Sequence, residues 1–195
     1  MLQPGFRDAV RESQSVFRLA MRAMASPGTI AACEPRLLPP RPLLPPAAAL
    51  VLALCDFETP IFLDQPLAAS ADVLEFLRFH TGARLVSAAG EAAFAVIADS
   101  ARLPALAGFA QGTPDYPDRS TTLIVQVESL QARDWRLMGP GIRGVARLRA
   151  TPLPNCFLDQ LHANRRQFPR GVDILLVTPM AMAALPRSVR ITEAC

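Results

Sequence analysis

The fold is decided by the stretch W-R-L-M-G-P-G-I-R-G-V-A-R-L-R at residues 135–149, which reads as two strands joined by a glycine-rich corner. Before the corner, Trp135 and Leu137 alternate with polar or outward positions, and after it Ala146 and Leu148 do the same, which is the period of a strand. The glycines at 139 and 141 can adopt the positive φ of a reversal, and the proline between them donates no hydrogen bond. We therefore predict structural turns at Gly139 and Gly141.

The corner also spells G-x-G-x-x-G over residues 139–144, the pattern of a dinucleotide-binding loop. That motif requires a helix to follow, because the pyrophosphate binds to amides at the helix N-terminus. Residues 145–149 alternate like a strand instead, and Pro152 and Pro154 prevent a helix nearby. The pattern therefore favours a turn between strands over a cofactor loop.

The composition indicates one globular domain spanning residues 1–195. Hydrophobic residues make up 51% of the chain and charged residues 19%, which is typical of a protein with a substantial core. The longest apolar run, 47–55, is far shorter than the roughly 18 residues of a membrane span. Asp8 and Glu12 lie where a signal peptide would be apolar. We expect a cytoplasmic protein without a membrane segment.

The cysteines and histidines do not form a metal-binding pattern. Cys33, Cys55, Cys156 and Cys195 are irregularly spaced, without a C-x-x-C pair, and the chain has only two histidines. We therefore expect no metal site, and we expect Cys33 and Cys55 to be buried free thiols, since their surroundings are apolar.

All 20 basic residues are arginines. Without lysine the chain cannot hold pyridoxal phosphate covalently or build a Walker-type phosphate loop, so we expect no cofactor, and arginine must bind any anion. Residues 1–130 carry 10 arginines against 13 acids, whereas residues 131–195 carry 10 against 4. The C-terminal third is therefore cationic, with a net charge of +6.

Working outward from the corner, periodicity and capping residues predict the other elements. A proline-rich arm or surface loop is expected at about 34–46, and a turn around Gly171. Helices are predicted at 7–24, at 47–55, from a Ser70 cap to Gly82, and from an Asn155 cap to Asn164, with a helix-like segment at 103–110. Strands are predicted at 60–63, 84–86, 92–98, 121–127, 174–177 and 186–191. This order favours an α/β fold with a mixed sheet covered by helices on both faces.

Several separate pieces of the chain match the pattern of one known family. They are Val16-Phe17-Arg18, Met24 with Pro27-Gly28, Leu77-Arg78-Phe79-His80-Thr81, Thr122-Leu123-Ile124, Leu137 with Gly139-Pro140-Gly141-Ile142, Phe168-Pro169 with Gly171-Val172-Asp173, and Leu185-Pro186-Arg187. Together they resemble the PhnH family, the H subunit of the bacterial carbon-phosphorus lyase system. The pieces occur in one order and cover nearly the whole chain.

The resemblance implies a fold similar to the large domain of pyridoxal-phosphate-dependent transferases, but without the cofactor, and a cytoplasmic homodimer. It also implies an assembly with the G, I and J subunits for phosphonate catabolism. That assembly is associated with making α-D-ribose 1-methylphosphonate 5-triphosphate from a nucleoside triphosphate and methylphosphonate. The family offers no agreed catalytic residue for this subunit, so a structural and substrate-handling role is expected.

Two alternatives remain at the level of the sequence. One is a stand-alone enzyme that processes phosphate or phosphonate compounds, in which His80 or His162 would lie near a nucleophile. The other is nucleic-acid binding by the cationic third, which ranks last because one tryptophan offers little stacking surface and no recognition motif accompanies it.

If the chain contacts nucleoside triphosphate or phosphonate, we expect the contact through Arg78, His80 or Arg187. A guanidinium can form bidentate hydrogen bonds to phosphonate oxygens, and a histidine can supply a hydrogen-bond donor or a proton near neutral pH. The competing interpretation is that Arg78 pairs with Glu75 on the same helix and that Arg187 is a surface or partner-facing residue.

Overall fold

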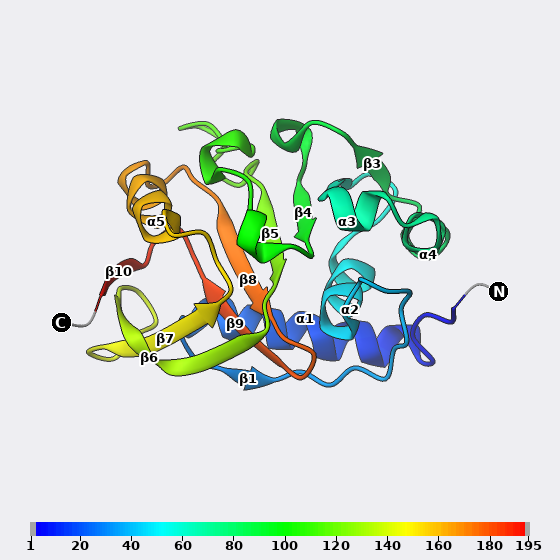
Figure 1. Ribbon diagram of the computed structural model, residues 1–195, viewed down its shortest axis with the longest axis horizontal. Coiled ribbons are helices and arrows are strands. Elements are labelled where there is room, and N and C mark those ends of the chain that lie inside the picture. Colours follow the sequence, from blue (N-terminus) through cyan, green and yellow to red (C-terminus); the bar gives the residue numbers. More distant parts are fainter. Residues whose placement is uncertain (1–2, 194–195) are drawn as a thin grey trace.

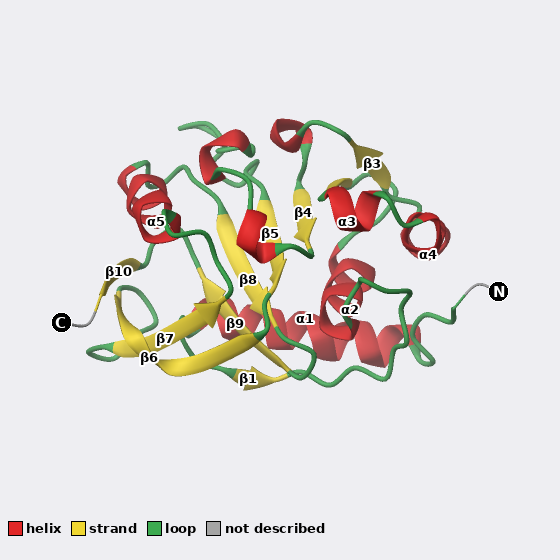
Figure 2. Cartoon of the chain, viewed as in Figure 1, coloured by secondary structure: helices red, strands yellow, loops and turns green. Residues whose placement is uncertain are grey.

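The computed structural model describes residues 3–193, which form two β-sheets packed with five α-helices (Figures 1 and 2). The larger sheet has seven strands in the order β1 (Ala31–Ala32), β9 (Ala181–Leu185), β8 (Asp173–Val177), β5 (Thr122–Gln126), β4 (Phe94–Ile97), β2 (Pro60–Leu63) and β3 (Arg84–Val86). The smaller sheet has the order β10 (Arg190–Glu193), β6 (Ser129–Met138) and β7 (Ala146–Thr151).

Strands β3, β2, β4, β5 and β8 are parallel, and at one edge β9 pairs antiparallel with β8 and β1 pairs antiparallel with β9. The central strands are apolar along their length because both faces are buried; Leu123, Ile124 and Val125 of β5 have no exposed surface. The mixed α/β sheet predicted from the sequence is therefore confirmed.

The two faces of the large sheet are covered differently. One face packs on the helices α1 (Ala9–Ala25), α2 (Pro45–Leu54) and α4 (Ala71–Thr81). The other packs on the small sheet, on α5 (Phe157–Arg166) and on short 3₁₀ turns. The expectation of helical layers on both faces holds for the first face only, because the second is shared between one α-helix and a separate sheet.

The glycine-rich corner at residues 139–144 is a turn between two antiparallel strands. Trp135 pairs with Leu148 and Leu137 with Ala146, with a bulge between residues 131 and 135. Gly139 and Gly141 have φ values of 150° and 78°. No helix follows, so the prediction of a turn in place of a dinucleotide loop is confirmed.

Specific side chains and a glycine define several helix ends, and those of α4, Ser70 and Gly82, were predicted from the sequence. The Asp8 side chain accepts from the Arg11 amide at the start of α1, and Ser70 accepts from the Val73 amide at 3.3 Å at the start of α4. Helix α4 ends at Gly82, whose φ of 67° suits glycine. No helix within residues 3–193 is long and apolar enough to cross a membrane.

Other local predictions were wrong. Residues 103–110 form only a 3₁₀ turn at Leu106–Gly108, because Pro104 interrupts the segment. Asn155 does not cap α5, whose N-cap is Cys156 without a side-chain hydrogen bond. The proline-rich arm ends earlier than predicted: Pro45 and Pro46 begin α2, where their missing amides cost nothing. That arm also packs on the core through Leu37 and Leu43.

Three further elements were not foreseen. Strand β1 has only two residues, helix α3 (Gln65–Ala68) is a single turn after β2, and β9 has an alanine-rich sequence that resembles a helix. The last strand begins at Arg190 in place of residue 186, since residues 181–185 already form β9.

Candidate functional site

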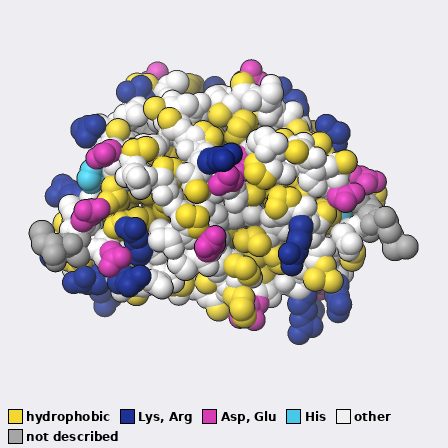
Figure 3. All heavy atoms as spheres, in the orientation of Figure 1, with side chains coloured by type: hydrophobic (Ala, Val, Ile, Leu, Met, Phe, Trp, Pro, Cys, Tyr) yellow, Lys and Arg dark blue, Asp and Glu magenta, His cyan; other side chains and the backbone are white. Residues whose placement is uncertain are grey.

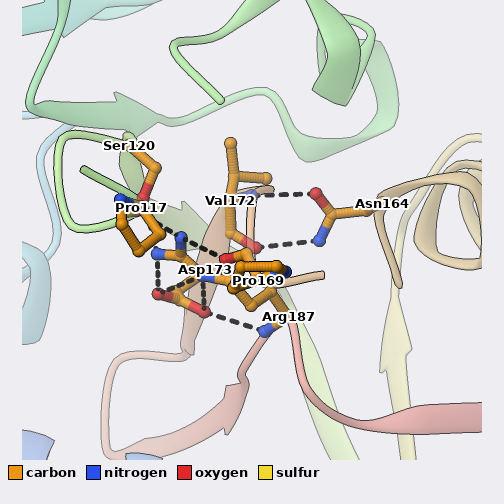
Figure 4. A network of polar contacts seen from close by, with 7 residues as sticks. All are labelled: Pro117, Ser120, Asn164, Pro169, Val172, Asp173 and Arg187. Atoms are coloured by element: carbon orange, nitrogen blue, oxygen red, sulfur yellow. Dashed lines mark hydrogen bonds and ion pairs between the residues drawn. The ribbon is translucent and has the colours of Figure 1, made fainter. Parts of the chain in front are cut away.

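Arg187 lies at the edge of the large sheet where β5 and β8 begin, enclosed by a network of polar contacts (Figure 4). Its Nε donates to both carboxylate oxygens of Asp173 at 3.1 Å, and its Nη2 donates to the same carboxylate and to the Ser120 hydroxyl. Its Nη1 donates to the Pro117 carbonyl at 2.7 Å. The Arg187 and Asp173 side chains are only 14% and 15% exposed, so this is a nearly buried ion pair.

The network ties three distant segments together. Arg187 follows β9, Asp173 begins β8, and Pro117 and Ser120 belong to the loop before β5. Beside it, the Asn164 amide group exchanges hydrogen bonds with the backbone of Val172 at 2.8 and 2.9 Å (Figure 4). Gly171 has φ of 117°, and a Cβ there would lie 2.7 Å from the Asn164 Oδ1. The hydrogen-bond donors of the Arg187 guanidinium are thus bonded to other groups of the protein, which favours a structural role for this residue. The predicted contact between Arg187 and a substrate stays a prediction.

Arg78 and His80 lie together on α4. Arg78 is exposed and borders a shallow hollow of about 480 Å³ with Glu75 and Phe79. The expected pairing between Arg78 and Glu75 does not occur within 4 Å among the described side chains. Phe79 is 69% exposed. Arg78 is therefore free to meet an anion, and that role stays a prediction.

His80 is held by the N-terminal segment. Its Nε2 lies 2.9 Å from the Gln3 carbonyl oxygen, which can only accept, so Nε2 carries the proton. The ring also packs on Phe76 at a centroid distance of 4.6 Å. The structure thus brings His80 to Arg78 but not to Arg187, because β5 and β4 separate β8 and β9 from the side of the sheet on which α4 lies (Figure 1).

A second candidate site, which the sequence did not predict, lies at the carboxyl ends of β2 and β4. Strand β3 lies on one side of β2 and β4 lies on the other, so the direction in which the chain adds strands reverses here. In open α/β sheets, ligands bind outside the carboxyl ends of the strands at such topological switch points. A crevice of about 340 Å³ lies here. It is lined by Pro42, Leu44, Pro66, Ala98, Asp99, Ser100, Gln126, Val127, Glu128 and Pro152.

Asp64, directly after β2, shapes this crevice. Its Oδ2 accepts from the amides of Ala98 and Asp99, both at 2.8 Å, while its Oδ1 is buried without a partner. Burial raises the pKa of the Asp64 carboxyl, and the two amide hydrogen bonds oppose this only in part. Gln126 closes the other wall by bonding the backbone of Leu44 and Pro42 at 2.7 and 2.9 Å.

The chemistry of the crevice is acidic. Asp99 and Glu128 line it, and Asp64 lies beneath. Carboxylates at this position accept hydrogen bonds from hydroxyl groups such as those of a ribose, but repel phosphate oxygens. The crevice is therefore suited to a hydroxylated or cationic group. A sequence signal existed, namely Asp64 after the apolar strand 60–63, but only the strand order showed its significance.

We expect the Asp64→Asn variant to gain stability relative to the parent protein as the pH rises. The folded-state pKa of Asp64 lies above its ordinary value of 3.8, so the native state binds more protons than the unfolded state above that pH. The contribution of Asp64 to the free energy of unfolding is thus lost as the pH rises through the folded pKa. Asparagine retains an oxygen for both amides and carries no charge.

Urea denaturation between about pH 4 and pH 8 measures the effect. The stability difference between Asp64→Asn and the parent should increase toward neutral pH, whereas Asp115→Asn in an exposed loop should show no such trend. If the difference in unfolding free energy between Asp64→Asn and the parent stays constant over this pH range, the pKa of Asp64 is not raised in the folded protein.

The cysteines show no reactive environment in the core. Burial raises the pKa of Cys33 to about 11 and that of Cys55 to about 12, so both thiols are neutral, as expected from their apolar surroundings. Cys156 is exposed, and Cys195 lies outside the described residues. Within residues 3–193, no three histidine, cysteine, aspartate or glutamate side chains gather closely enough to bind a metal ion.

Comparison with known proteins supports the resemblance found in the sequence. The model of a family described as bacterial phosphonate metabolism protein (PhnH) matches residues 4–192. The chain is 41% identical over 187 residues to the alpha-D-ribose 1-methylphosphonate 5-triphosphate synthase subunit PhnH of Rhizobium meliloti (strain 1021), covering 95% of this chain and 93% of the relative. It is 32% identical over 186 residues to the putative C-P lyase subunit protein HtxG of Stutzerimonas stutzeri, covering 91% and 85%.

Proposed function

The chain belongs to the PhnH family of bacterial phosphonate metabolism proteins, and from that membership we propose that it is a subunit of a carbon-phosphorus lyase assembly. In that assembly it contributes to forming α-D-ribose 1-methylphosphonate 5-triphosphate from a nucleoside triphosphate and methylphosphonate. The observation that carries this proposal is the 41% identity to a synthase subunit over nearly the full length of both chains. The proposed partners are the G, I and J subunits, in the cytoplasm.

Within the assembly we assign the chain a structural and substrate-handling role in preference to catalysis on its own. A stand-alone hydrolytic enzyme would need a base beside a nucleophile. The Nε2 atoms of His80 and His162 instead bind the backbone carbonyls of Gln3 and Ile191, at 2.9 and 2.6 Å. We further propose that the large sheet is similar to the large domain of pyridoxal-phosphate-dependent transferases, and that the chain forms a homodimer.

Helix α1 offers the surface that we propose for a partner subunit. This dark-blue helix runs along one side of the molecule in Figure 1 and packs inward through Val16, Ala20 and Ala23. Its outer stripe, defined as Val10, Phe17 and Met21, is 65%, 47% and 44% exposed. Exposed arginines at 11, 18 and 22 flank the stripe. An apolar surface with an acidic rim complements it, whereas two copies of this helix would bring arginines together.

We expect the Phe17→Asp variant to lose binding to the partner subunits by at least about tenfold, because it places a charge in the centre of the outer stripe. The variant should fold normally, since the side chain is half exposed. Copurification with the G, I and J subunits measures the loss. Phe57→Asp is the matched control, because Phe57 is 72% exposed but lies before β2, outside α1. Equal copurification of both variants would rule out α1 as the contact.

A further inference from the structure

A second hollow, about 420 Å³ in volume, lies between the small sheet and the start of α5. Trp135 of β6 and Arg149 of β7 reach it from neighbouring strands, and Asn155, Phe157 and Leu158 reach it from the beginning of α5. The rest of its lining is Ala150, Thr151, Pro152, Leu153, Pro154 and Glu193. Unlike the acidic crevice, this hollow contains a guanidinium.

The indole of Trp135, a residue that lines this hollow, has a buried and unsatisfied donor. The residue is only 2% exposed, and its Nε1 has no hydrogen-bond partner. A buried N–H without an acceptor is unfavourable because it has lost its hydrogen bond to water, so native proteins rarely retain one. The ring is fixed against Phe157, with centroids 5.9 Å apart. The donor is therefore held in place and lacks only an acceptor.

Arg149 supplies the positive charge. Its guanidinium carbon lies 5.3 Å from the centroid of the Trp135 ring, and its side chain is 38% exposed. Its ion pair with Asp134 is 4.0 Å long, at the limit of a contact. A weak pair of this kind contributes little to stability, so the guanidinium can move from the ring to a stronger anion.

The start of α5 adds a second attraction for negative charge. The N-cap residue Cys156 makes no side-chain hydrogen bond to the first turn of this ten-residue helix. The Phe157 amide donates to the Pro154 carbonyl at 2.9 Å, and the first turn also carries Asp159, so the attraction for an anion comes from the following amides and the helix dipole. Exposed arginines at 133, 136, 143 and 147 surround the small sheet, and Figure 3 shows cationic side chains gathered at this end of the molecule.

We propose that this hollow binds the tetrahedral oxyanion of a phosphorus compound. Arg149 moves from the Trp135 ring to the anion, which opens the indole N–H to one of its oxygens, and the start of α5 faces another. The apolar side chains of Leu153 and Leu158 suit an alkyl substituent. Glu193, which also lines the hollow, can accept a hydrogen bond from the hydroxyl group of a singly protonated phosphonate.

The oxyanion site itself is inferred from the residues of the hollow. Only the identity of the oxyanion rests on the proposed function: it is either a free alkylphosphonate or the phosphate groups of a nucleotide. Pro152 lines both this hollow and the acidic crevice, so the two sites adjoin. A nucleoside triphosphate could therefore place its phosphates in the hollow and its ribose in the crevice.

Trp135 is the only tryptophan of the chain, so intrinsic fluorescence reports directly on this hollow. The purified full-length chain is titrated with methylphosphonate, inorganic phosphate, tripolyphosphate and ATP at constant ionic strength. We expect saturable fluorescence changes with at least one of them. Tightest binding of methylphosphonate identifies an alkylphosphonate site, and tightest binding of tripolyphosphate or ATP identifies a nucleotide phosphate site.

Arg149→Ala should weaken binding at least about tenfold, whereas Arg147→Ala, an exposed arginine two residues earlier on the same strand, should change it less than about twofold. If Arg149→Ala fails to fold, Arg149→Gln replaces it, because it keeps most of the stem without the charge. In Trp135→Phe, calorimetry should show weaker binding with the ring retained.

No saturable response to any of the four compounds, or equal affinity in Arg149→Ala and the parent, overturns the proposal. Binding is measured on the isolated chain, so failure to assemble with partner subunits would contradict the proposed function without affecting this result.

Discussion

Replacing Gly141 with alanine is expected to destabilise the protein by more than about 3 kcal/mol, because two costs act at one position. The residue has φ of 78°, which disfavours any side chain. An added Cβ would also overlap the carbonyl oxygen of Ala25 and lie 3.0 Å from its carbonyl carbon, at the end of α1. Either the corner or the helix end must shift.

Gly144 provides a matched control in the same turn. Its φ of 74° is nearly the same, but an added Cβ there meets no atom within 4 Å. Gly144→Ala should therefore show the backbone cost alone, about 1 kcal/mol. Urea denaturation of the two variants separates the backbone cost of a positive φ from the cost of the overlap with Ala25. Equal losses would mean that the corner does not pack on α1 as described.

Replacing Arg187 with alanine is expected to cost about 3–5 kcal/mol, because it leaves the Asp173 carboxylate nearly buried without its cation. It also removes the donors to the Pro117 carbonyl and the Ser120 hydroxyl, which hold the loop before β5. The midpoint of urea denaturation should fall accordingly. Arg190→Ala, an exposed arginine of β10, should change stability by less than about 0.5 kcal/mol.

The double variant Arg187→Met with Asp173→Leu tests whether the unpaired charge causes the loss. Replacing a buried ion pair with apolar residues of similar size is often tolerated, so the double variant should be more stable than Arg187→Ala. If instead Arg187→Ala retains full stability while product formation falls, Arg187 acts on substrate, as the sequence first suggested.

Much of the fold followed from local patterns. The alternation around Trp135, Leu137 and Leu148 predicts the hairpin because its inner face is buried, and Ser70 and Gly82 mark α4 because helix ends need specific caps. The alternation cannot show that this hairpin forms a separate sheet, since that depends on pairing with β10. Strand β9 was missed because alanine favours helix locally, and tertiary pairing with β8 overrides that preference.

The candidate sites were harder to predict. Arg187 was predicted to contact an anion, which stays a prediction, and its ion pair was not foreseen because its partner Asp173 is 14 residues away and becomes its neighbour only through β8 and β9. The hollow at Trp135 depends on α5 approaching the small sheet, which no spacing in the chain reveals. The expected contact through Arg78 has no structural test and stays a prediction.

The central claim, that this chain is a working subunit of the phosphonate assembly, is tested most directly by adding it back. The G, I and J subunits are assayed with a nucleoside triphosphate and methylphosphonate, with and without the purified chain, and α-D-ribose 1-methylphosphonate 5-triphosphate is quantified. We predict that the chain alone forms no product and that its addition raises product formation at least about tenfold. Unchanged product formation after addition, with the chain folded and present in excess, would contradict the account.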